Sequence, residues 1–241
     1  MRRATVLTMS TVLLAGVLAL DTFTSSPAPA APAAHVGNLG LTGPQMRADM
    51  IAAAGSASAL LIKGRVSTSG TATTLYLQLN KSSASGDIRS AAADVPFVAV
   101  NGISYVQFTA SLVTMSGQDP TSPAGKQLLG EWVPSTSQMG SSVASSIAGF
   151  TSLNALASTM LTSPTDTITA DGTATVDGRT VAQYKDTTTS GSESEFSLPL
   201  TGPALPVQEV GLGANSGTVT FTWNYPTTVT APPANEIYSG S

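Results

Sequence analysis

Few residues in this chain of 241 could perform acid–base or nucleophilic chemistry. The only histidine is His35, and there is no cysteine. A Ser-His-Asp triad would have to use His35 as its base, because a serine nucleophile needs an adjacent proton acceptor. Since His35 lies in a stretch rich in Ala and Pro, we expect no such triad and interpret the protein as a non-enzyme.

The acidic residues offer little more. Asp171 and Asp177 flank expected strands, where aspartate is a common turn residue, so we do not interpret them as metal ligands. Glu193 and Glu195 share one face of an expected strand, and we assign them to its solvated side. No glycine-rich phosphate loop follows a strand and opens a helix. The sequence therefore predicts neither a metal nor a cofactor.

The N-terminus has the pattern of an export signal. Arg2 and Arg3 precede an uncharged run, 4–20, and the following stretch is rich in Ala and Pro. We predict a signal peptide at 1–33, cleaved near Ala30 or Ala33. An uncleaved membrane anchor is the alternative, because about 17 apolar residues is the lower limit for spanning a bilayer. A flexible tether is expected at 34–42 and a single domain at 43–241.

Charged residues make up only 10% of the chain, and the net charge is −4. A typical soluble domain has about a quarter charged residues. This balance argues against nucleic acid as a partner, because phosphate binding needs clustered Lys and Arg. The 34 residues of 132–165 contain no charge at all, which indicates that much of this segment is hidden from water.

Most of the remaining sequence predicts antiparallel strands. Apolar residues alternate with polar ones between 59 and 108, and an Asn-Gly pair at 101–102 separates two apolar runs. Such a pair is a strong hairpin signal. An Asp-Gly pair at 177–178 predicts a second hairpin, and further strands are expected at 193–198, 207–212 and 218–223.

Two segments have helical periodicity. A short amphipathic helix is expected at 44–55, with Met50 on its apolar face. One long helix is expected across 139–160, between the two sets of strands. Its apolar residues recur every three or four positions: Met139, Val143, Ile147, Phe150, Leu153, Leu156 and Met160. By periodicity alone this face fits ordinary core better than a ligand wall.

The order of these motifs resembles the actinobacterial exported proteins of the LppX, LprA and LprG type, which are similar in fold to the LolA and LolB lipoprotein carriers. The resemblance rests on five segments: 130–133, 176–184, 205–207, 219–226 and 231–233.

The resemblance implies an α+β fold, in which a curved antiparallel half barrel is covered on its concave, apolar side by helices. It also implies an acyl-chain cavity, with Met50 and the seven residues of the long helix as candidate lining. The chain lacks the lipobox cysteine of many family members, so we expect a secreted or extracytoplasmic protein without a lipid anchor.

The expected function is that of a monomeric lipid carrier, which could make transient contacts with a membrane or with envelope proteins. The alternative is a non-catalytic protein-interaction or sensor domain on the same fold.

Overall fold

The computed structural model describes residues 37–68, 70–160 and 166–239. The expected signal peptide, the first residues of the expected tether and His35 therefore lie outside the described residues. None of the helices within those ranges is long and apolar enough to cross a membrane.

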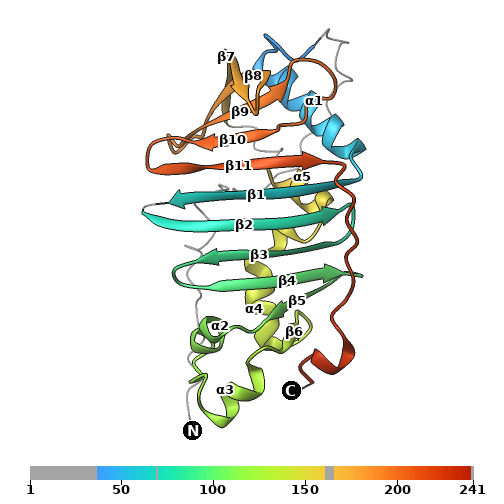
Figure 1. The fold of residues 1–241 in the computed structure, drawn as a ribbon, viewed down its shortest axis with the longest axis vertical. Coiled ribbons are helices and arrows are strands. Elements are labelled where there is room, and N and C mark those ends of the chain that lie inside the picture. Colours follow the sequence, from blue (N-terminus) through green and yellow to red (C-terminus); the bar gives the residue numbers. More distant parts are fainter. Residues whose placement is uncertain (1–36, 69, 161–165, 240–241) are drawn as a thin grey trace.

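The core of the fold is one antiparallel sheet of eleven strands, strongly elongated across its strands (Figure 1). Its order is β6-β5-β4-β3-β2-β1-β11-β10-β9-β8-β7. The first set of strands is β1 (Ala59–Thr68), β2 (Thr71–Asn80), β3 (Ala84–Ser90), β4 (Asp94–Val100), β5 (Ile103–Gln107) and β6 (Trp132–Pro134). The second set is β7 (Thr167–Val176), β8 (Arg179–Thr187), β9 (Glu193–Pro199), β10 (Gln208–Gly211) and β11 (Asn215–Trp223).

Both hairpins expected from the sequence are confirmed. Asn101 and Gly102 have φ values of 54° and 77°, and Asp177 and Gly178 have φ values of 48° and 74°. Positive φ at both central residues gives the turn the twist that neighbouring strands require. The flanking residues pair in register as β4 with β5 and as β7 with β8.

The two sets of strands join where the first strand pairs with the last. β1 and β11 are antiparallel over their whole length, with Leu60 opposite Trp223. Gly64 lies at a close approach in this pair, because a Cβ there would be 2.3 Å from the carbonyl oxygen of Thr218. Glycine in a strand interior is typical of such close backbone approach. The expected curved α+β architecture is confirmed.

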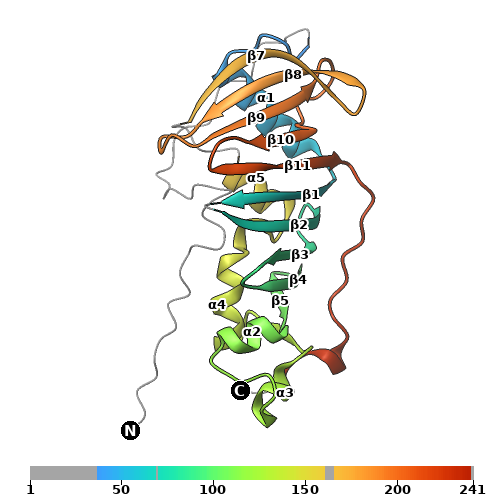
Figure 2. The same cartoon turned by 60° about the vertical axis from the view of Figure 1, so that its left-hand side comes forward.

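Helices cover one face of this sheet (Figures 1 and 2). Helix α1 lies beside β7 to β10, whereas α4 and α5 lie behind β1 to β5. The helices are α1 (Gly43–Ser56), α2 (Ala110–Met115), α3 (Pro123–Leu128), α4 (Gln138–Ser146) and α5 (Leu153–Met160), with short 3₁₀ turns η2 (Ala148–Phe150) and η3 (Ala234–Glu236). The expected helix at 44–55 is confirmed as α1, while α2 and α3 were not expected from the sequence.

The single long helix expected across 139–160 is wrong. The chain forms α4, then η2, then α5, with Ile147 at φ −109° and ψ 7° between the first two. Hydroxyl groups account for the interruption, since Ser and Thr side chains compete for backbone hydrogen bonds. Ser146 Oγ donates to the carbonyl oxygen of Val143 at 2.6 Å, and Ser152 Oγ accepts from the backbone N–H of Ala155 at 3.0 Å, which begins a new helix.

The expected flexible tether is also wrong for the part that the structure describes. Asn38 and Leu41 are both buried, with 4% of each residue exposed. The Asn38 side-chain amide donates to the carbonyl oxygen of Pro199, and the Leu41 backbone N–H donates to the Tyr184 hydroxyl at 2.9 Å. Residues 37–42 therefore extend the domain, because they satisfy buried polar groups of β8 and β9.

The C-terminal segment after β11 runs past the ends of successive strands, from β11 towards β6 (Figure 1). Asn224 N–H donates to the carbonyl oxygen of Ala59, and Thr227 Oγ1 donates to the side-chain oxygen of Gln78. Ile237 then forms a parallel bridge with Trp132 in β6. This segment thereby links the two ends of the first set of strands.

Candidate functional site

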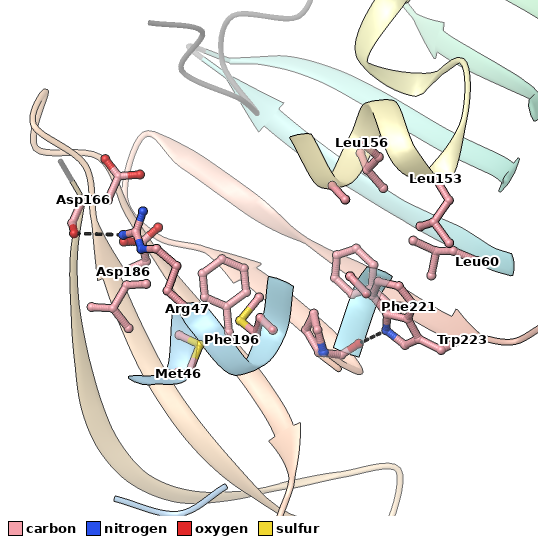
Figure 3. A pocket seen from close by; sticks show the side chains of 15 residues that line it. Met46, Arg47, Leu60, Leu153, Leu156, Asp166, Asp186, Phe196, Phe221 and Trp223 are labelled. Carbon is pink, nitrogen blue, oxygen red and sulfur yellow. Dashed lines mark hydrogen bonds between the residues drawn. The ribbon is translucent and has the colours of Figure 1, made fainter. Parts of the chain in front are cut away.

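An apolar pocket lies between α1, α5 and the concave face of the sheet (Figure 3). Helix α1 contributes Met46, Met50 and Ala54, and α5 contributes Leu153 and Leu156. The remaining lining comes from Leu60, Ala157, Ile168, Phe196, Pro206, Phe221 and Trp223, together with the charged residues Arg47, Asp166 and Asp186.

The pocket marks the seam between two hydrophobic cores. Met46 and Met50 pack in a smaller core with Tyr184 and Leu198 of β8 and β9. Leu153 and Leu156 belong instead to a larger core that extends over β1 to β6 and includes Val219 and Phe221 of β11. Each helix thus packs in its own core, and the pocket lies where the two helices meet.

The pocket is small. Its volume is about 60 Å³, whereas ligand sites usually enclose about 300–1,000 Å³. Trp223 lies at the end away from the charged residues (Figure 3), and its indole Nε1 donates to the carbonyl oxygen of Pro206 at 2.7 Å. This volume is too small for a ligand with a long chain, which would need a wider pocket.

The opposite end of the pocket is charged. Arg47 Nη2 donates to the backbone carbonyl oxygen of Asp166 at 3.1 Å, and the guanidinium lies beside Asp186 (Figure 3). Burial, and then repulsion from Asp166, raise the pKa of Asp186 to about 6. Arg47 and the Thr187 backbone N–H act in the opposite direction on this pKa.

A third carboxylate lies close to Asp186 on the concave face. Glu209 in β10 is paired with Phe196, which lines the pocket. Burial raises the pKa of Glu209 to about 7, while a hydrogen bond with the Ser194 side chain lowers it and the charge of Asp186 raises it further. Acidic side chains on an otherwise apolar face are uncommon, because a buried charge needs a partner.

The eight residues predicted from the sequence to line a cavity fall into two groups in the structure, those at the pocket and those in or against the larger core, with Met160 as the exception. Met50, Leu153 and Leu156 line the pocket. Val143, Ile147 and Phe150 lie in the larger core, and Met139 packs partly buried against it. Met160 ends α5, and its side chain lies outside the described residues.

Sequence reasoning missed the charged end of the pocket, although a signal was present. In β8, Ala182, Tyr184 and Asp186 occupy alternate positions and therefore share one face. Ala182 and Tyr184 are fully buried. An aspartate that continues this row is therefore expected to be at least partly buried among apolar side chains. Glu193 and Glu195, in contrast, pair with Lys185 and Gln183 on the other face, as expected.

The described residues contain no group of three or more His, Cys, Asp or Glu side chains arranged to hold a metal ion. The pocket lining within the same ranges includes no Ser, Cys or His. The pocket offers apolar contact together with the charged groups of Arg47, Asp166 and Asp186.

Comparisons with known proteins find similarity in structure only. No protein-family model matches the chain, and no curated protein matches it. Among solved structures, the chain is similar to lipoprotein LppX of Mycobacterium tuberculosis, with 17% identity, a TM-score of 0.48, and coverage of 78% of this chain and 100% of that one. It is also similar to LprF of Mycobacterium bovis, with 14% identity, a TM-score of 0.49, and coverage of 80% and 99%.

A further similar structure is a putative outer membrane lipoprotein-sorting domain of Vibrio parahaemolyticus, with 8% identity, a TM-score of 0.31, and coverage of 80% and 94%. LppX is the type of protein that the sequence resemblance names. This chain is therefore similar in structure to LppX, to LprF and to a lipoprotein-sorting domain.

Proposed function

We propose that this protein is an exported, non-catalytic carrier that holds an acyl chain between α1, α5 and the concave face of the sheet. One observation carries the proposal: the apolar pocket lies where two separately packed cores meet. Export is inferred from residues 1–33, and the acyl ligand agrees with what the sequence resemblance implies.

The seam offers a physical route for a chain to enter. Met46 and Met50 keep their contacts with β8 and β9 if α1 moves away from α5, and Leu153 and Leu156 keep those with the larger core. Opening the pocket would therefore expose only the apolar side chains that line it. An acyl chain would cover the same side chains again, which returns about 25 cal/mol for each Å² removed from water.

The direct test is to purify the protein without detergent and to analyse it by native mass spectrometry and organic extraction. We expect an acyl lipid to co-purify, or a fluorescent fatty-acyl probe to bind the lipid-free protein. Blocking the pocket should abolish binding. Ala54 lines the pocket and is buried, whereas Ala52 is exposed on the same helix, so Ala54→Met is the blocking variant and Ala52→Met is its matched control.

Thermal melting of both variants should show that they remain folded, because Ala54→Met fills existing space. A folded parent protein that carries no lipid and binds no acyl probe would overturn the carrier proposal. The interaction or sensor domain would then be the remaining hypothesis.

A further inference from the structure

The pocket is chemically asymmetric, and this asymmetry bears on the head group of its ligand. Leu60, Phe221 and Trp223 form one end, and Arg47, Asp166 and Asp186 form the other (Figure 3). An amphipathic ligand has one low-energy orientation in such a pocket, since each polar group is costly to bury without a partner. Its chain would lie against the apolar end and its head group beside Asp186.

The charged end has an unused hydrogen-bond acceptor. Oδ1 of Asp186 is buried and accepts no hydrogen bond within the part of the chain that the structure describes. Nearly all buried side-chain oxygen atoms in proteins have a partner. An ionised carboxylate can only accept, so the missing partner must be an N–H or O–H donor.

Arg47 is the single cation that the described residues place in the pocket lining, and it does not favour an anionic head group. Arg47 already donates to the backbone of Asp166 and lies near the carboxylates of Asp166 and Asp186. One guanidinium beside two carboxylates leaves an excess of negative charge when all three are ionised, and Glu209 lies close behind. Like charges repel more strongly in a partly buried site than in water.

We propose that the pocket selects acyl ligands whose head group presents N–H or O–H donors and carries no negative charge. This inference rests on the proposed carrier function. Ammonium groups and hydroxyl groups share the required donor chemistry, whereas a fatty-acid carboxylate or a phosphate monoester does not.

Three ligands with the same twelve-carbon chain test the proposal: dodecylamine, 1-monododecanoylglycerol and dodecanoate, each below its micelle concentration. Binding is followed by the fluorescence of Trp223, which lines the pocket. A Trp132→Phe background removes the only other tryptophan. At pH 7.5, above the pKa of about 6 of Asp186, we expect the amine and the glycerol ester to bind at least about tenfold more tightly than dodecanoate, equivalent to one charge-assisted hydrogen bond.

Asp186→Asn should reduce this preference, because the neutral amide keeps the shape of the side chain and removes its charge. Asp171→Asn is the matched control, since it changes the net charge equally at an exposed position of β7. If the amine loses more affinity than the glycerol ester in Asp186→Asn, the ammonium charge is the recognised feature. If both lose affinity equally, donor hydrogen bonding is the recognised feature.

The failures of the two proposals are distinguishable. Absence of binding by all three ligands would overturn the carrier function itself. Dodecanoate that binds as tightly as the amine, with Asp186→Asn indistinguishable from Asp171→Asn, would leave the carrier function intact and overturn the head-group inference.

Discussion

The two halves of the sheet differ in what their concave faces bury. The half formed by β1 to β6 buries a large cluster of apolar side chains, including Leu77 and Phe97, against α4 and α5. In the half formed by β7 to β11, β8 and β9 pack in a smaller core with α1, and Asp186 and Glu209 lie on the same concave face. The first half contributes Leu60 to the pocket lining, whereas the second half contributes Ile168, Asp186, Phe196, Phe221 and Trp223.

We infer from this difference that the two halves of the continuous sheet have different roles. Close packing of the larger core stabilises the domain, because a close-packed interior gains both from burial and from dispersion contacts. On the concave face beside the smaller core, Oδ1 of Asp186 has no partner within the described residues, which costs stability and would favour the ligand proposed above. Four measurements can break or sharpen this comparison.

The largest effect is expected in the larger core, at Ile147, of which only 1% is exposed. Ile147→Asn buries an amide without a partner and removes apolar contacts, which should cost about 4 kcal/mol of unfolding free energy. Since domains have about 5–15 kcal/mol in total, the variant should be largely destabilised in urea or thermal melts. Ser145→Asn on the exposed side of α4 is the control. Retained stability of Ile147→Asn would show that this face borders an open space rather than closed core.

The second largest effect is expected at Tyr184, the anchor of the smaller core. Its hydroxyl donates to the carbonyl oxygen of Asn38 and accepts from Leu41 N–H. Tyr184→Phe leaves both backbone groups without this partner and should cost about 2 kcal/mol. Hydrogen exchange should also become faster at residues 38–41. Unchanged exchange there would mean that these residues are held by other contacts, and Tyr76→Phe, at an exposed tyrosine, is the control.

A smaller effect is expected from pH. The pKa of Asp186 is raised from 3.8 to about 6, and that of Glu209 from 4.5 to about 7. The folded state therefore binds more protons than the unfolded state between about pH 4 and 7, so stability falls as pH rises through this window. The unliganded protein should be more stable at pH 5 than at pH 7.5, by on the order of 1–2 kcal/mol.

The control for the pH effect is the double variant Asp186→Asn, Glu209→Gln. It should melt at a higher temperature than the parent at pH 7.5 and show a flatter dependence on pH. A parent protein that is instead most stable at pH 7.5 would contradict the conclusion that burial in this half disfavours the ionised forms of Asp186 and Glu209.

The smallest effects are expected on the convex face, where the two halves should behave alike. Arg89 pairs with Asp87 and Asp94 in the first half, and Lys185 pairs with Glu193 at 2.8 Å in the second. Exposed ion pairs contribute little, because water screens the charges and the side chains lose entropy. Arg89→Ala and Lys185→Ala should each leave the melting temperature nearly unchanged. A clear loss in one half only would show that its convex face also contributes to stability.

Local sequence determined the elements that depend on a few neighbouring residues. The Asn101-Gly102 and Asp177-Gly178 turns form because these pairs tolerate positive φ. Helix α1 follows from Pro44 near its start and from the spacing of Met46 and Met50. Alternation of apolar and polar residues gave the strands their inner and outer faces, since the side-chain period of a strand is two.

Only the tertiary structure decided what depends on distant partners. The pairing of β1 with β11 brings residues 147 to 163 positions apart into one register. The burial of Asn38 and Leu41 depends on hydrogen-bond partners in β8 and β9. The break between α4 and α5 separates Ile147, in closed core, from Leu156, at the pocket. The apolar periodicity of the sequence is the same at both positions. The hydrophobic effect is non-directional, so this periodicity predicts that a side chain is buried but does not predict whether it faces close-packed core or a pocket.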